Sequence, residues 1–67
     1  MLYLKRKKDN KIILQFNTTY ELADNEKLLI ELFGEDNFKE IQLDLRLNAF
    51  KMCLTSTVLD YGDYIVE

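Results

Sequence analysis

The sequence predicts a small α+β domain, built as an antiparallel sheet with one helix in the order β-β-α-β-β, with an optional short fifth strand. Apolar and polar residues alternate at both ends of the chain, as in strands with one buried face. A stripe of apolar residues at helical spacing lies between them. The 67 residues contain no proline and only two glycines, so no linker divides them and residues 1–67 form a single domain.

The first element is a β-hairpin with strands over residues 2–7 and 11–16. Leu2, Leu4 and Arg6 alternate with Tyr3, Lys5 and Lys7, and the second strand alternates in the same way from Ile12 to Phe16. Asp9 and Asn10 tolerate the positive φ that a tight turn requires.

A helix follows, over residues 19–33 or 24–33. Thr18 with Glu21 matches a capping box and favours the earlier start, whereas Asp24 could cap the shorter helix. The apolar stripe consists of Leu28, Leu29, Leu32 and Phe33. Gly34 stands where a helix commonly ends, and we expect Leu29 and Phe33 to face the core.

The second half of the chain is predicted to be β-structure. Residues 41–47 alternate apolar and polar side chains, which is typical of a strand with one wet face. A second alternating segment runs from Phe50 to Val58 or Leu59. Residues 60–63 have turn chemistry, and residues 64–66 could add a short final strand.

The charges are divided unevenly along the chain. Residues 1–11 carry five bases and one acid, a net charge of +4, while residues 12–67 carry four bases and eleven acids, a net charge of −7. Two fields of opposite sign on one small body favour binding over catalysis.

The residue types argue against an enzyme. The chain has no histidine to activate the single cysteine, Cys53, and no cysteine pair to hold zinc. Asp60 and Asp63 lack the oxygen ligands and the spacing of a calcium loop. We therefore expect no catalytic residue, no metal, no cofactor and no small-molecule substrate.

The opening residues 1–7, Met-Leu-Tyr-Leu-Lys-Arg-Lys, resemble the N-terminus of the carbon storage regulator (CsrA/RsmA) family of bacterial mRNA-binding translational regulators. The Ile-Ile-Leu of residues 12–14 stands in the place of that family's second strand, and an RsmN-like variant inserts a helix after it. The resemblance implies RNA contacts from Leu4, Arg6 and Lys7. The family's late arginine has no counterpart, since no arginine follows Arg46.

Two surfaces are candidate binding sites. The first strand could hold RNA, its lysines neutralising phosphates and its tyrosine stacking on a base; equally, lysines protect an edge strand from pairing with other chains. The nucleic-acid-binding candidates are Tyr3, Leu4, Lys5, Arg6 and Lys7. The alternative is an acidic protein-binding face made by Glu31, Glu35, Asp36 and Glu40. Such a face either mimics nucleic acid or simply aids solubility.

The sequence thus predicts a small cytoplasmic regulatory protein. The leading function is that of an RNA-binding translational regulator; the alternative is a phage or mobile-element inhibitor or adaptor of a basic host protein, and an assembly subunit is a third. A chain of this size, 48% hydrophobic and without a disulfide or metal, favours a homodimer formed through an apolar sheet surface or an edge strand. No segment is apolar enough to span a membrane.

Overall fold

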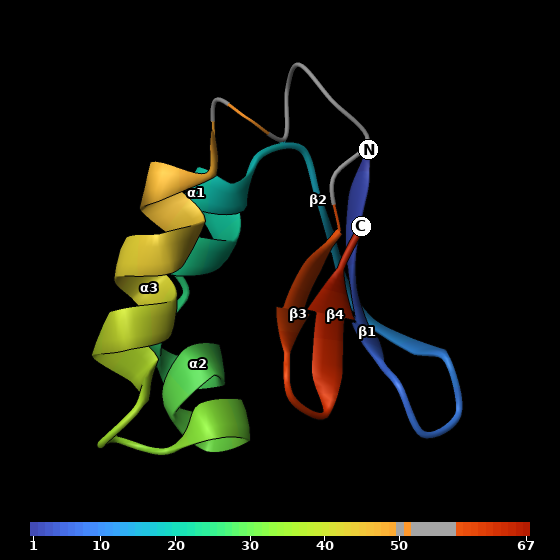
Figure 1. The fold of residues 1–67 in the computed structure, drawn as a ribbon, viewed down its shortest axis with the longest axis horizontal. Helices are drawn as coiled ribbons and strands as arrows, with labels where there is room; N and C mark the ends of the chain where they lie inside the picture. The colour runs from blue at the N-terminus through green and yellow to red at the C-terminus, as the bar shows by residue number, and fades with distance from the viewer. Residues whose placement is uncertain (50, 52–57) are drawn as a thin grey trace.

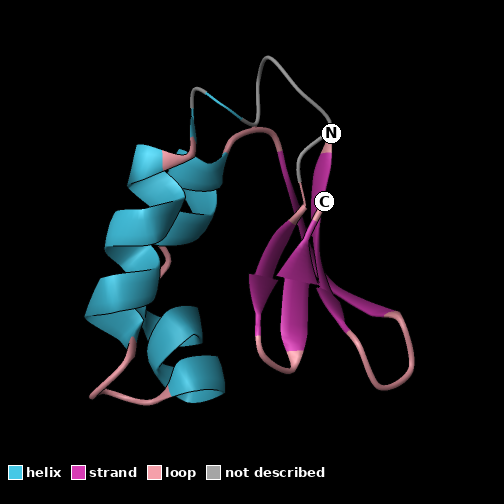
Figure 2. Cartoon of the chain, in the orientation of Figure 1, coloured by secondary structure: helices cyan, strands magenta, loops and turns pink. Residues whose placement is uncertain are grey.

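A computed structural model describes residues 1–49, 51 and 58–67, and it places a sheet and a group of helices in two layers (Figure 1, Figure 2). The predicted α+β class is confirmed, with three helices in the described part of the chain instead of one. The elements are β1 Leu2–Arg6, β2 Lys11–Phe16, α1 Thr19–Ala23, α2 Glu26–Phe33, α3 Phe38–Leu47, β3 Leu59–Tyr61 and β4 Tyr64–Val66.

The sheet is antiparallel with the strand order β2-β1-β4-β3. The predicted hairpin of β1 and β2 is confirmed, and Asn10 supplies the positive φ of its turn at 61°. The final strand β4 pairs with β1 and places Leu4 opposite Val66. Strand β1 is therefore internal, and the idea that its lysines protect a sheet edge is wrong.

A bulge interrupts the pairing of β1 with β2. Leu4 lies opposite Leu14, but Lys5 lies opposite Ile12, so Ile13 is the extra residue of β2. Because opposite residues share a face of the sheet, Ile12 joins Lys5 on the side away from the core. Ile12 is accordingly 52% exposed, while Ile13 packs against the core.

The predicted single helix is two helices that break at Asp24 and Asn25. Thr18 begins α1 without the side-chain bond of a capping box, and the carboxylate of Glu21 accepts the Asn17 N–H at 2.9 Å instead. Asn25, rather than Asp24, caps α2 by accepting the Leu28 N–H. Both proposed starts thus correspond to real helix starts within one or two residues.

Residues 41–47 are not a strand; they belong to helix α3. Ile41 and Leu45 are one helical turn apart and face the core, whereas Leu43 and Leu47 lie on the opposite side, 58% and 72% exposed. Two such pairs, offset by two residues, give every second residue an apolar side chain. A helix that is apolar on two faces therefore produces the period expected of a strand.

The strand expected over residues 50–59 lies mostly outside the described residues. Leu59 is the first residue of β3, which pairs with β4 through a turn at Gly62 (φ 77°). The short final strand over residues 64–66 is confirmed as β4.

The core lies between the helices and the inner face of the sheet. Leu29 is fully buried, as expected, and Phe33 packs edge-to-face on Tyr61 and Tyr64 with ring centroids 6.2 and 5.3 Å apart. Among the described residues, the fully buried large side chains are Leu4, Leu22, Leu29, Leu45, Val66 and Thr19. The sheet's inner face is thus joined to α2 through an aromatic cluster.

Two buried hydrogen bonds join α1 to α3. Thr19 Oγ1 donates to the Leu45 carbonyl at 2.6 Å, and Gln42 Nε2 donates to the Ala23 carbonyl at 2.7 Å. Both polar side chains are thereby satisfied inside the protein, which fixes the register of the two helices.

Candidate functional site

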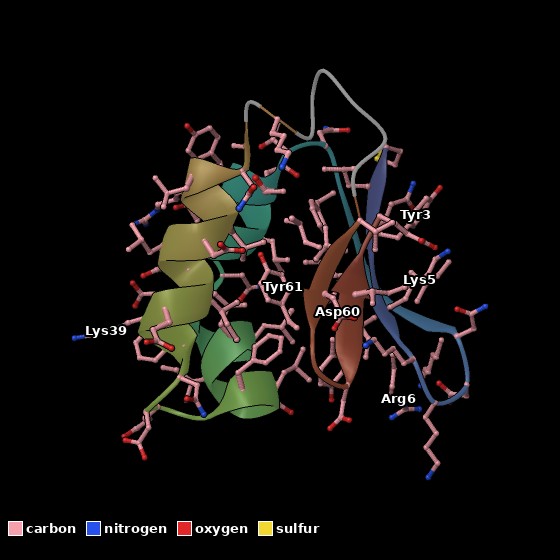
Figure 3. All side chains as sticks on the ribbon, viewed as in Figure 1. Tyr3, Lys5, Arg6, Lys39, Asp60 and Tyr61 are labelled. Atoms are coloured by element: carbon pink, nitrogen blue, oxygen red, sulfur yellow. The ribbon has the colours of Figure 1, made fainter. Side chains whose placement is uncertain are left out.

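The outer face of the sheet, which the helices leave uncovered, carries alternate residues of β1 (Figure 1). Tyr3 and Lys5 lie on this face, with the Lys5 ammonium 5.7 Å from the centre of the Tyr3 ring (Figure 3). Lys5 also donates to the Glu67 carboxylate at 2.7 Å. The arrangement predicted for stacking a base is present, but its lysine already has an anionic partner.

Lys7 and Arg6 are neutralised in the same way. Lys7 Nζ donates to both carboxylate oxygens of Asp60 at 2.8 and 2.7 Å, and this bond, with the Gly62 N–H, lowers the pKa of Asp60. Arg6 binds Asp9 through two N–H groups at 3.1 and 2.7 Å. That fork lowers the pKa of Asp9 to about 2. A phosphate at β1 would compete with three carboxylates already in place.

The fifth RNA-contact candidate, Leu4, is a core residue. Its side chain is 0% exposed and packs with Phe16 and Val66 in the main cluster. The sequence already contained the signal, because Leu4 alternates with Tyr3 and Lys5 and so points to the opposite face. Among the described residues, Lys8 and Lys11 are the N-terminal bases without an ion pair.

The four acidic candidates lie in the segment that runs from α2 through its connector into α3. We call them the acidic corner: Glu31, Glu35, Asp36 and Glu40. All four are exposed, and within the described part of the chain none forms a salt bridge. Their charge is therefore directed to solvent without compensation.

The helical layer and the sheet differ in net charge. Residues 17–49, which hold the helices, contain eight acids and three bases, a net charge of −5. Residues 1–16 and 58–67, which hold the sheet, contain five bases and four acids, a net charge of +1. The +4 of the N-terminal segment is largely cancelled because the acidic C-terminal hairpin lies beside it.

No family model, curated protein or solved structure matches this chain. The resemblance to the carbon storage regulator family therefore stays a prediction from the first fourteen residues. Over residues 1–49, 51 and 58–67, no helix is long and apolar enough to cross a membrane. The same residues contain no group of three or more acidic or cysteine side chains placed to hold a metal ion.

Proposed function

We propose that this chain is a small regulatory protein that binds a basic surface of a partner protein through the acidic corner. The observation that carries the proposal is the difference in pairing: Lys5, Arg6 and Lys7 are bound to carboxylates, whereas the corner's four carboxylates are unpaired in the described structure. The proposal is the inhibitor or adaptor of a host protein, in which the corner occupies a groove that otherwise holds nucleic acid.

Binding a charged partner costs less at the acidic corner than at β1. The corner's carboxylates meet a basic partner without breaking any intramolecular ion pair, and their field accelerates encounter. A phosphate at β1 must displace Glu67 or Asp60 from a lysine first. The corner contributes mainly association rate and specificity, so binding should weaken steeply as salt rises.

Single-stranded RNA on the outer sheet face is the second candidate function. The favourable observation is that Tyr3 and Lys5 lie on an internal strand, on a face that the helices leave open. A base could stack on Tyr3 while Lys5 exchanges Glu67 for a phosphate. This is the surface through which a translational regulator would act.

Paired titrations distinguish the two functions. The probes are a lysine- and arginine-rich peptide, followed by fluorescence anisotropy, and single-stranded RNA, followed by filter retention at low salt. We expect the peptide to bind with a steep salt dependence and the RNA not to be retained. The double variant Glu35→Gln, Asp36→Asn should weaken peptide binding several-fold. Asp63→Asn, which removes an exposed acid of the β3–β4 turn, is the matched control and should not.

RNA retention without peptide binding would support RNA binding at β1 instead. If RNA is retained and Lys5→Ala and Lys7→Ala each weaken it, with the salt slope falling by about 0.7 per lost contact, the acidic-corner proposal fails. The proposal also includes a non-catalytic role, a macromolecular partner and no cofactor. The cytoplasm is the compartment we propose, because a lone cysteine cannot form an intramolecular disulfide.

A further inference from the structure

Helix α3 has a second apolar face that the fold does not use. Leu45 is fully buried, while Leu43 and Leu47 are 58% and 72% exposed. At about 100° of rotation per residue, these two leucines lie one turn apart on a line opposite Leu45. We call Leu43 and Leu47 the α3 ridge. Its position accounts for the strand-like alternation of the sequence.

The ridge faces away from every element of the described fold. The inner side of α3 packs against α1 and α2, and Asp44 accepts the Tyr61 hydroxyl across to the sheet at 2.6 Å. Figure 3 shows Lys39, one turn before Leu43, pointing outward from the helical layer. Contiguous exposed apolar side chains mark interaction sites, and Leu43 and Leu47 are neighbours on this face.

Charged residues of opposite sign flank the ridge. Helical geometry places Glu40 and Asp44 along one flank and Lys39 and Arg46 along the other. Asp44 bonds Tyr61, and Arg46 lies 3.6 Å from Asp24 of the α1 C-cap. Lys39 and Glu40 have no ion pair in the described structure, so they are the flanking charges open to a partner.

This flanking pattern fits a second copy of the chain. In a two-fold pair of parallel helices, the acidic flank of each copy faces the basic flank of the other. Glu40 then meets Lys39 of the partner on both sides of the seam, and the dimer leaves Glu31, Glu35 and Asp36 of the acidic corner for a basic partner protein. An antiparallel pair would place like charges together. We infer that the α3 ridge is the seam of a parallel two-fold homodimer, rather than the sheet surface or edge strand that the sequence suggested.

The size of the seam sets the strength of the dimer. Stable dimers bury about 1,200–2,000 Å² in total, and two leucines per copy with their charged flanks contribute less than this. The dimer should therefore be weak and should form in the micromolar range, with a monomer that is folded on its own.

Sedimentation equilibrium of the intact protein over a range of micromolar concentrations tests the inference. We expect a monomer–dimer equilibrium that Leu43→Gln and Leu47→Gln each abolish without changing the circular dichroism spectrum. Ile12→Gln is the matched control, since Ile12 is a comparably exposed apolar residue on the opposite layer. A wild-type monomer at every concentration, or a dimer lost on Ile12→Gln instead, would overturn the inference.

Charge reversal tests the parallel geometry. Lys39→Glu or Glu40→Lys should each weaken dimerisation roughly tenfold, because each replaces two symmetry-related attractions by repulsions. The double variant exchanges the flanks and should restore the affinity. Tighter association of Lys39→Glu alone would contradict the parallel seam. Absence of any effect from the single variants would contradict it as well.

Discussion

At the residue scale, Lys5 of β1 and Lys7, which directly follows β1, bind carboxylates at the other end of the chain. Glu67 and Asp60 are 62 and 53 positions away in the sequence. Glu67 directly follows β4, which pairs with β1, and Asp60 lies in β3 on the other side of β4. Each pair is exposed enough to contribute little to stability. Together the pairs cancel the field of the basic segment, and this decides which surface is available for a charged partner.

The ion pair between Arg6 and Asp9 makes the stability of the fold depend on pH in the acidic range. The two hydrogen bonds from Arg6 hold the folded-state pKa of Asp9 at about 2, below its ordinary value of 3.8. The pair therefore stabilises the fold above pH 3.8, and this contribution is lost as the pH falls toward 2. Thermal melting between pH 5 and pH 2 should show a shallow loss that is smaller in Asp9→Asn. An unchanged loss in the variant would mean that the pair is not formed in solution.

The hydrogen-bonded phenol of Tyr61 makes the fold lose stability at high pH. Burial, followed by the hydrogen bond to Asp44, raises the pKa of Tyr61 well above its ordinary value of 10.0. The folded state holds the phenol proton, so this stabilisation is complete below pH 10 and is lost as the pH rises above it. Tyr61→Phe should lower the free energy of unfolding by about 1–3 kcal/mol at neutral pH and reduce the alkaline loss. Tyr20→Phe, at an exposed site, is the control, and equal melting of both variants would refute the role of the bond.

Residue patterns predicted part of the candidate sites. Alternation placed Tyr3 and Lys5 on one face of β1 and would also have excluded Leu4. The pairing of Lys5 with Glu67 depends on which strand joins β1, and no local pattern contains that information. The acidic corner was predictable because its residues are close in sequence.

At the element scale, α3 shows why a correct periodicity can give a wrong element. One apolar face of α3 packs on the core through Ile41 and Leu45, and the other is exposed and holds Leu43 and Leu47. The same residues therefore fit both a helix template and a strand template. The helix that contains Leu29 has a single apolar face and was located correctly. The break at Asp24 and Asn25 was not predicted: the two caps were alternatives for one helix, and each lies near the start of a separate helix.

Alanine substitutions distinguish the helix from the strand. A strand would bury Leu43 and Leu45 on the same face, whereas α3 buries Leu45 alone. Leu45→Ala should reduce the free energy of unfolding by about 2–5 kcal/mol. Leu43→Ala should change it by less than about 0.5 kcal/mol. Urea denaturation measures both, below the concentration at which dimers form, and equal losses would contradict the helix.

At the scale of the whole molecule, the fold converts a charge gradient along the sequence into two layers of different charge. The N-terminal bases and the C-terminal acids combine in a nearly neutral sheet, and the middle of the chain forms an acidic helical layer. The sequence predicted the α+β class because turns and apolar faces are local features. It did not predict the sheet order, which sets the charge of each layer, because that order depends on contacts between the ends of the chain.

The acidic corner is tested most directly by NMR, with an amide spectrum recorded during titration of the ¹⁵N-labelled protein. The basic peptide and the single-stranded RNA are added to separate samples at low salt. We expect the peptide to shift the amides of Glu31, Glu35 and Asp36 and to leave β1 unmoved, while RNA shifts neither set. RNA-dependent shifts at Tyr3, Lys5 and Lys7, with no peptide-dependent shift at the acidic corner, would contradict it.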